Sequence, residues 1–152
     1  MIGFTAEEID QGAPTRAARL KWVVVVDAGL APGRAANAAI CTAAATSRAV
    51  EGLLGDDAVD ADGGTHPGLP WLGCTVLAAD AETLRTVRRK AAARADFFVA
   101  DMPAAAQHTR VYAEYLDAVK ETGADDLDYY AVSIVGPRNP LDKIVGKLPL
   151  LG

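Results

Sequence analysis

The sequence has few aromatic residues, which limits the kind of core that it can form, and no long apolar run, which excludes a membrane-spanning helix. Aromatic residues make up 6% of the 152 residues although 51% are hydrophobic, so we expect an aliphatic core with closely packed, alanine-rich helices. No stretch approaches the roughly 20 apolar residues that span a bilayer, so no membrane partner is expected. The first ten residues hold Glu7, Glu8 and Asp10 and no basic residue, which predicts no signal peptide.

Cysteine and histidine are also scarce. The two cysteines, Cys41 and Cys74, lie in apolar segments and cannot form a disulfide framework, so we expect both to be reduced, buried and structural. This usage is typical of a cytoplasmic protein. Two histidines without short metal-ligand spacing predict no metal site. Residues 29–33 lack the glycine spacing and the Lys-Ser/Thr ending of nucleotide-binding loops, so we expect no cofactor.

The chain has no excess of positive charge. Its net charge is −5 and its pI is near 4.9, which disfavours tRNA as a partner because nucleic-acid affinity comes largely from cations that neutralise phosphates. The one dense cationic cluster consists of Arg85, Arg88, Arg89 and Lys90. This cluster is either a solvated helix face or a contact for an anion or RNA.

Buried apolar runs alternate with helical patterns along the chain. The strands that these patterns predict are residues 20–26, 73–79, 97–100 and 127–135. The predicted helices are residues 34–50, 81–95 and 104–121, with a short helix at 141–145 and a loose excursion or small hairpin at 52–70. We therefore predict a single α/β domain over residues 1–152, with a lead-in segment at 1–18 and a three-layer sandwich that has helices on both faces of the sheet.

Two strand ends carry acids where ligands of α/β sheets tend to bind. Asp27 follows the first strand, and the helix after it places Arg34, Asn37 and Cys41 on one side. These residues are a candidate site. Alternatively, Asp27 and Arg34 satisfy turns and solvent, Asn37 faces water and Cys41 packs as a small core residue.

The third predicted strand ends at Asp101, followed by Met102 and Pro103. The next helix brings His108 into the neighbourhood, so a carboxylate–imidazole pair could activate water near neutral pH. The alternative is that Asp101 only caps the next helix. Cys41 would be a nucleophile only with a neighbouring base.

Several segments resemble the type II peptidyl-tRNA hydrolases. The opening likeness lies in residues 21–26 (KWVVVV), 30–34 (LAPGR) and 38–43 (AAICTA). It continues through 80–84 and 99–101 and returns at 136–148, so that it spans about residues 20–151. Within that superfamily the chain is most similar to an uncharacterised bacterial branch, the domain-of-unknown-function family two thousand. Asn37, residues 59–63, Asp101-Met102 and residues 136–143 carry that closer likeness.

The resemblance implies a mixed four-stranded sheet flanked by helices, the fold of type II peptidyl-tRNA hydrolases, and hydrolysis of the ester between a peptide and tRNA. Asp101 matches the conserved acid of that family. Residues 33–36 (GRAA) stand where the family has glycine-lysine-glycine-lysine, so Arg34 remains and the second lysine is absent. Ala43 and Ala105 stand where the family has a histidine and a threonine.

Three functions follow from these observations. The first is an ester or amide hydrolase with a degenerate site, in which Asp101, Arg34 and His108 are catalytic. The second is a non-catalytic module that binds a small molecule or a protein, and the third is a different small-molecule enzyme in the same cleft. Candidate substrate-binding residues are Asn37, Asp27, Met102 and Cys41. The expected ligand is a small molecule or acyl ester, and a homodimer is left open.

Overall fold

The computed structural model describes residues 2–152 and has the α/β organisation that the sequence predicts. The main strands are β1 (Leu20–Asp27), β4 (Thr75–Ala79), β5 (Phe98–Pro103) and β6 (Tyr129–Pro137). The helices are α1 (Pro32–Ala49), α2 (Ala81–Ala92), α3 (Ala105–His108), α4 (Tyr112–Lys120) and α5 (Arg138–Val145). Two short 3-10 helices, Ala6–Glu8 and Thr15–Ala17, precede β1. Within the described residues no helix has both the length and the apolar character needed to cross a bilayer.

The four main strands form one mixed sheet in the order β4-β1-β6-β5. β1 runs parallel to β4 and antiparallel to β6, and β5 runs antiparallel to β6. The valine run of β1 is buried and lies in the middle of the sheet, as expected for a strand that is apolar on both faces. β5 is therefore an edge strand, with one side open to neighbouring side chains.

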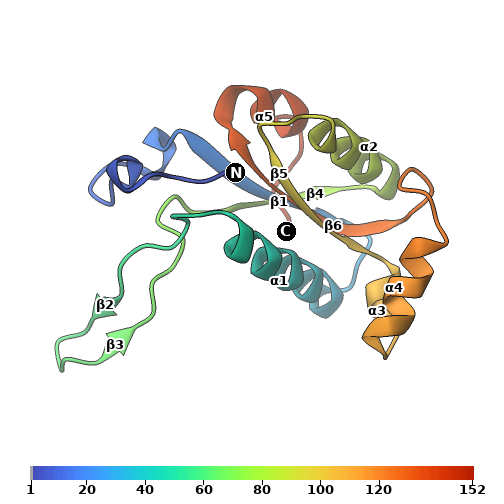
Figure 1. Cartoon of the computed structure of the whole chain (residues 1–152), viewed down its shortest axis with the longest axis horizontal. Coiled ribbons are helices and arrows are strands. Elements are labelled where there is room, and N and C mark those ends of the chain that lie inside the picture. The colour runs from blue at the N-terminus through green and yellow to red at the C-terminus, as the bar shows by residue number, and fades with distance from the viewer. Residues whose placement is uncertain (1) are drawn as a thin grey trace.

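Helices cover both faces of the sheet because alternate residues of β1 point to opposite sides. Val24 and Val26 pack in one cluster with Ala35 and Ala38 of α1. Val23 and Val25 pack in a second cluster with α2 and α5. Figure 1 shows α1 below the sheet and α2 and α5 above it.

A buried chain of hydrogen bonds joins the two central strands to α1. The indole Nε1 of Trp22 donates to Ser133 Oγ over 2.8 Å. The hydroxyls of Thr46 and Ser133 lie 2.7 Å apart, and Thr46 also donates to the Thr42 carbonyl of its own helix over 2.8 Å. All of these polar groups are buried and partnered, so the network fixes how α1 sits on β1 and β6.

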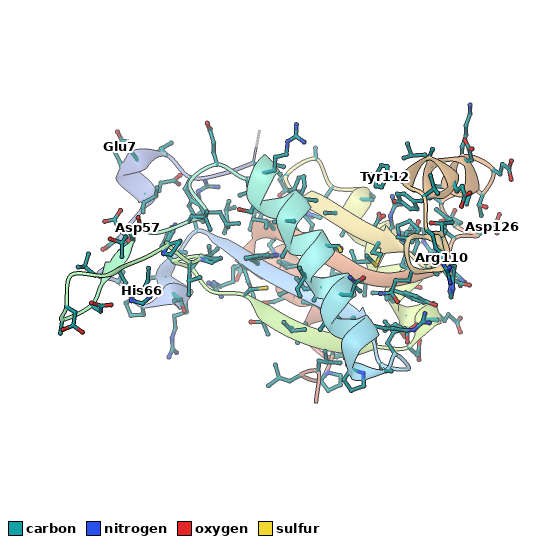
Figure 2. The ribbon with its side chains drawn as sticks, turned by 90° about the horizontal axis from the view of Figure 1, so that it is seen from below. Glu7, Asp57, His66, Arg110, Tyr112 and Asp126 are labelled. Carbon is teal, nitrogen blue, oxygen red and sulfur yellow. The ribbon has the colours of Figure 1, made fainter. Side chains whose placement is uncertain are left out.

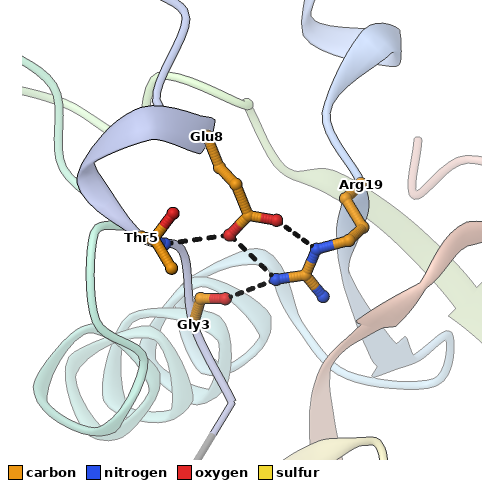
Figure 3. Close-up of polar contacts among 4 residues, drawn as sticks. All are labelled: Gly3, Thr5, Glu8 and Arg19. Carbon is orange, nitrogen blue, oxygen red and sulfur yellow. Dashed lines mark hydrogen bonds and ion pairs between the residues drawn. The ribbon is translucent and has the colours of Figure 1, made fainter.

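The lead-in segment packs against the domain through the buried side chain of Phe4, a backbone hydrogen bond and an ion pair. Phe4 is buried, and its backbone N–H donates to the Glu51 carbonyl over 2.9 Å. Glu8 closes a capping box with Thr5 and accepts hydrogen bonds from the guanidinium of Arg19, just before β1 (Figure 3). The Arg19 hydrogen bonds, with help from the Thr5 backbone, lower the pKa of Glu8 to about 2.

The excursion at residues 52–70 is a small hairpin that projects from the domain (Figure 1). Its strands are β2 (Ala58–Val59) and β3 (Thr65–His66), which confirms the predicted hairpin. Asp60 accepts from two backbone N–H groups at the tip and contacts His66 Nε2 at 3.0 Å. Asp60 therefore organises the turn at the tip of the hairpin.

The single helix predicted over residues 104–121 is wrong. The structure has two helices there, α3 and α4, separated by Thr109, Arg110 and Val111. Thr109 has extended backbone angles (φ −112°, ψ 152°), and its hydroxyl donates back to the Ala105 carbonyl over 2.9 Å. Val111 is also extended, and β-branched residues on both sides of Arg110 favour this break.

The prediction that both cysteines are buried is also wrong. Cys41 and Cys74 are free thiols, and both residues are exposed. The buried face of α1 consists of Ala35, Ala38, Thr42 and Thr46. In a helix made mostly of alanine and threonine, the apolar and polar faces differ little, so the sequence did not reveal that Cys41 faces outward. Part of Cys74 faces solvent while its sulfur lies against protein, and this burial raises the pKa of the thiol to about 12.

Candidate functional site

A pocket of about 530 Å³ lies beside edge strand β5, between α1 and α4. Its size is within the range of roughly 300–1,000 Å³ that is usual for small-molecule sites. The residues that line it come from three parts of the chain and are Asn37, Cys41, Thr42, Ala45, Asp101, Met102, Ala106, Thr109, Arg110, Val111, Tyr112 and Tyr115. The pocket therefore combines polar and apolar walls, as most ligand sites do.

Local structure explains how these residues meet. Asn37, Cys41 and Ala45 are four residues apart and share one face of α1. Asp101 and Met102 are near the end of β5, where a register shift follows at Pro103. The break between α3 and α4 places Arg110 at the pocket, and α4 adds the two tyrosines.

Asp101 is held by Arg88 of α2. Arg88 Nε donates to Asp101 Oδ2 over 3.0 Å, and the two side chains are only 26% and 21% exposed. The Arg88 guanidinium also lies 5.3 Å from the centre of the Tyr129 ring. Asp101 therefore enters the pocket as a carboxylate whose charge is already balanced, and it does not cap α3, whose N-cap residue is Ala104.

Arg110 is the other charged residue of the pocket lining. Among residues 2–152 it forms no ion pair within 4 Å, and it is exposed. Figure 2 shows Arg110 and Tyr112 at the end of the molecule formed by α3 and α4, far from Asp57 and His66 of the hairpin. The local charge that the pocket offers to a ligand is therefore positive.

Two tyrosines form the aromatic part of the wall. Tyr112 and Tyr115 pack edge to face, with ring centres 5.4 Å apart. Burial raises the pKa of Tyr115, and the neighbouring Tyr112 and Asp101 add to the rise. The Tyr115 hydroxyl therefore stays protonated at neutral pH and can donate a hydrogen bond.

A side-chain bridge separates this pocket from Arg34. Gln107 Nε2 donates to the Arg34 carbonyl over 2.9 Å and to Asn37 Oδ1 over 3.2 Å. Asn37 lines both the main pocket and a shallower hollow of about 360 Å³, whose wall includes Arg34. Arg34 does not line the pocket that contains Asp101.

Two further predicted site residues also lie outside the pocket. His108 Nε2 contacts the Tyr130 hydroxyl at 2.8 Å, so the pairing of His108 with Asp101 is not formed. Asp27 accepts from the Gly29 backbone N–H over 2.8 Å and stabilises the turn after β1. Of the seven residues proposed from the sequence, the structure brings Asn37, Cys41, Asp101 and Met102 together in one pocket.

The sequence reasoning missed the residues that complete this site. The sequence places Arg88 in a cationic cluster that is either a solvated helix face or a contact for an anion or RNA. Its pairing with Asp101 depends instead on how α2 lies against β5. Arg110, Tyr112 and Tyr115 were placed inside one long predicted helix. A signal was present in the alternation of Thr109 and Val111 around Arg110, which is unfavourable for a continuous helix.

Comparison with known proteins adds two matches. Residues 20–152 match the family described as "Protein of unknown function (DUF2000)". The structure is similar to that of a protein of unknown function from Agrobacterium tumefaciens strain C58, with a TM-score of 0.82 and 19% sequence identity over 88% of this chain and 98% of that chain. No curated protein matches the sequence significantly. Neither description names an activity, and the family match covers most of the chain. The chain therefore belongs to the DUF2000 family of proteins of unknown function.

Proposed function

We propose that this chain binds a small amphipathic carboxylate in the pocket between α1, β5 and α4, without hydrolysing it. The observation that carries the proposal is the difference between the two charged residues of the wall. Asp101 is neutralised by Arg88, whereas Arg110 has no acidic partner within 4 Å among residues 2–152. A guanidinium suits a carboxylate because its planar N–H groups can donate two parallel hydrogen bonds.

The remaining walls suit the apolar part of such a ligand. Met102, Val111 and the two tyrosine rings supply aliphatic and aromatic surface. Val111 and Tyr112 are 54% and 74% exposed, so large apolar groups border the pocket without a covering segment among residues 2–152. Asn37 and the Tyr115 hydroxyl supply polar contacts that would orient the ligand.

The arrangement favours binding over hydrolysis. Ester hydrolysis needs a base or nucleophile together with donors placed where the oxyanion forms. Arg34 lines the neighbouring hollow and His108 contacts Tyr130. Two of the three predicted catalytic residues therefore do not line the pocket that contains Asp101. The third, Asp101, shares its carboxylate with Arg88. The resemblance to type II peptidyl-tRNA hydrolases rests on sequence segments, and the reaction that it implies stays a prediction.

The test compares two probes that differ in charge, 4-phenylbutyrate and its neutral amide. A ligand of this size gains about 0.3 kcal/mol per non-hydrogen atom, which for about twelve atoms corresponds to a Kd of about 2 mM. Titration followed by 1H–15N NMR should give saturable shifts at the backbone amides around the pocket for the acid. The amide should bind about tenfold more weakly, because it lacks the charge that Arg110 recognises.

Variants assign the effect to the pocket. Arg110→Gln should weaken 4-phenylbutyrate binding about tenfold and leave binding of the amide unchanged. Arg89→Gln is the matched control, because Arg89 is an exposed arginine of α2 that does not line the pocket. Equal binding of acid and amide, or no loss in Arg110→Gln, would contradict the proposal. Sustained hydrolysis of the 4-nitrophenyl ester that disappears in Asp101→Asn would show instead that the hydrolase hypothesis is right.

A further inference from the structure

A second pocket, of about 340 Å³, lies at the other end of the sheet. Lys21 pairs with Gly136 at the start of β1, whereas Val26 and Met102 both pair with Ala131 near the first pocket. Five residues of strand separate these two levels, a distance of roughly 17 Å. The second pocket is therefore independent of the site proposed above.

The charged residues that line this second pocket all have the same sign. Arg16, Lys21 and Arg138 line it, and no carboxylate does, although acids outnumber bases by 20 to 15 in the whole chain. Lys21 Nζ is paired with Asp142 Oδ1 at 2.6 Å. Arg16 and Arg138 form no ion pair within 4 Å among residues 2–152. Two guanidinium groups are thus available to an anion.

The rest of the lining also offers hydrogen-bond donors. Thr15 and Thr75 contribute hydroxyl groups. Arg138 is the first residue of α5, and the N-terminus of this helix has no side-chain cap, so its partial positive charge adds to that of the arginines. A wall rich in donors and free of carboxylates suits an oxyanion with several acceptor atoms.

We propose that this second pocket binds a phosphate group, carried either by a small phosphomonoester or by inorganic phosphate. A phosphate fits better than a carboxylate because it presents at least three acceptor oxygens to the two arginine forks. Cys74 also lines the pocket, but its thiol has a pKa of about 12 and stays protonated at neutral pH. The site is therefore one of binding rather than of thiolate chemistry.

The experiment titrates the protein with inorganic phosphate, glycerol 3-phosphate and acetate at constant ionic strength, followed by 1H–15N NMR. Saturable shifts confined to the amides of Gly73, Cys74, Thr75 and Arg138 are expected for both phosphates and not for acetate. A much tighter Kd for glycerol 3-phosphate would identify a phosphomonoester as the ligand. Equal values would identify free phosphate.

Substitutions test the two free arginines. Arg16→Gln and Arg138→Gln should each weaken phosphate binding about tenfold, and Arg138→Lys should weaken it less, because the charge remains. Arg89→Gln should change the Kd less than about twofold, because this exposed arginine does not line the pocket. Melting curves check that each variant is folded. Linear shifts spread over all basic residues, or unchanged binding in the folded Arg16→Gln/Arg138→Gln double variant, would overturn the proposal.

Discussion

Arg88 Nε donates a hydrogen bond to Asp101 Oδ2 over 3.0 Å, which joins helix α2 to edge strand β5. Side chains alternate along β5, so Asp101 follows Val99 on the face covered by α2, while Met102 points to the face covered by α1. Because β5 is at the sheet edge, Asp101 also reaches the pocket beyond it. One contact thus stabilises the fold and sets the charge of the pocket.

This contact should make a measurable contribution to stability. Both side chains are mostly buried, so we expect a coupling free energy of about 1–2 kcal/mol in a double-mutant cycle of Arg88→Gln and Asp101→Asn. The measurement is urea unfolding of the wild type, both single variants and the double variant.

Arg85 and Asp128 form the matched control pair for this cycle. Arg85 is on the same helix and lies 2.7 Å from Asp128, but Asp128 is 67% exposed. Solvent screens such a pair, and its coupling should be below about 0.5 kcal/mol. Equal coupling energies for the two pairs would show that the Arg88–Asp101 contact has no special structural role.

The buried network around Ser133 leads to a second prediction. Ser133→Ala removes the partner of the Trp22 indole N–H and leaves that group unsatisfied in the core, at a cost of about 1–3 kcal/mol in the free energy of unfolding. Ser47→Ala should cost less than about 0.5 kcal/mol, because Ser47 is a partly exposed residue of α1 outside the network. Urea unfolding measures both changes. An unaltered midpoint for Ser133→Ala would contradict the assigned hydrogen bond.

The Glu8–Arg19 contact predicts a pH dependence. Glu8 has a folded pKa of about 2, below its ordinary value of 4.5, so its ionised form favours the folded state. The stabilisation is complete above about pH 5 and is lost as the pH falls towards 2. Glu8→Gln should therefore melt at a lower temperature than the wild type at pH 7, with a difference that shrinks between pH 5 and 3. A difference that stays constant over this range would contradict the lowered pKa.

The two cysteines should react at different rates. A pKa of about 12 leaves so little Cys74 thiolate at pH 8 that its alkylation should be about a thousand times slower than that of a free cysteine of ordinary pKa. Cys41→Ser isolates Cys74, and its iodoacetamide kinetics can be followed by mass spectrometry. Cys74→Ser isolates Cys41, which is exposed and should be labelled in the native protein. Labelling of Cys74 as fast as free cysteine would show that its sulfur is not enclosed.

The main strands could be predicted from the sequence because a strand that is buried on both faces is a continuous run of apolar residues. Residues 20–26 are an unbroken apolar run, and the structure has β1 at Leu20–Asp27. Aspartate favours the N-cap position of a helix, and Asp80, directly before the predicted helix at 81–95, accepts from the Thr83 N–H over 2.7 Å at the start of α2. The order of the strands cannot be predicted from a local pattern, because it depends on contacts between segments that are distant in the sequence.

The candidate site could be predicted only in part, because some of its contacts join segments that are distant in the sequence. Asn37 and Cys41 share a helix face, and Asp101 and Met102 follow an apolar strand, so all four could be found from local patterns. The partners of Asp101 and His108 could not, because Arg88 and Tyr130 meet them through tertiary packing. Alanine supplies too little contrast between buried and exposed positions to reveal which way α1 faces.

The most direct test of ligand binding uses the methionine methyl groups. The sequence has two methionines, Met1 and Met102, and Met102 lines the pocket. In protein labelled with 13C-methyl-methionine, Met102→Leu assigns the signals. We predict that 4-phenylbutyrate shifts the Met102 methyl signal saturably and gives nuclear Overhauser effects from this methyl group to the phenyl protons. Binding that leaves the Met102 methyl signal unmoved, with no such effects, would contradict the account.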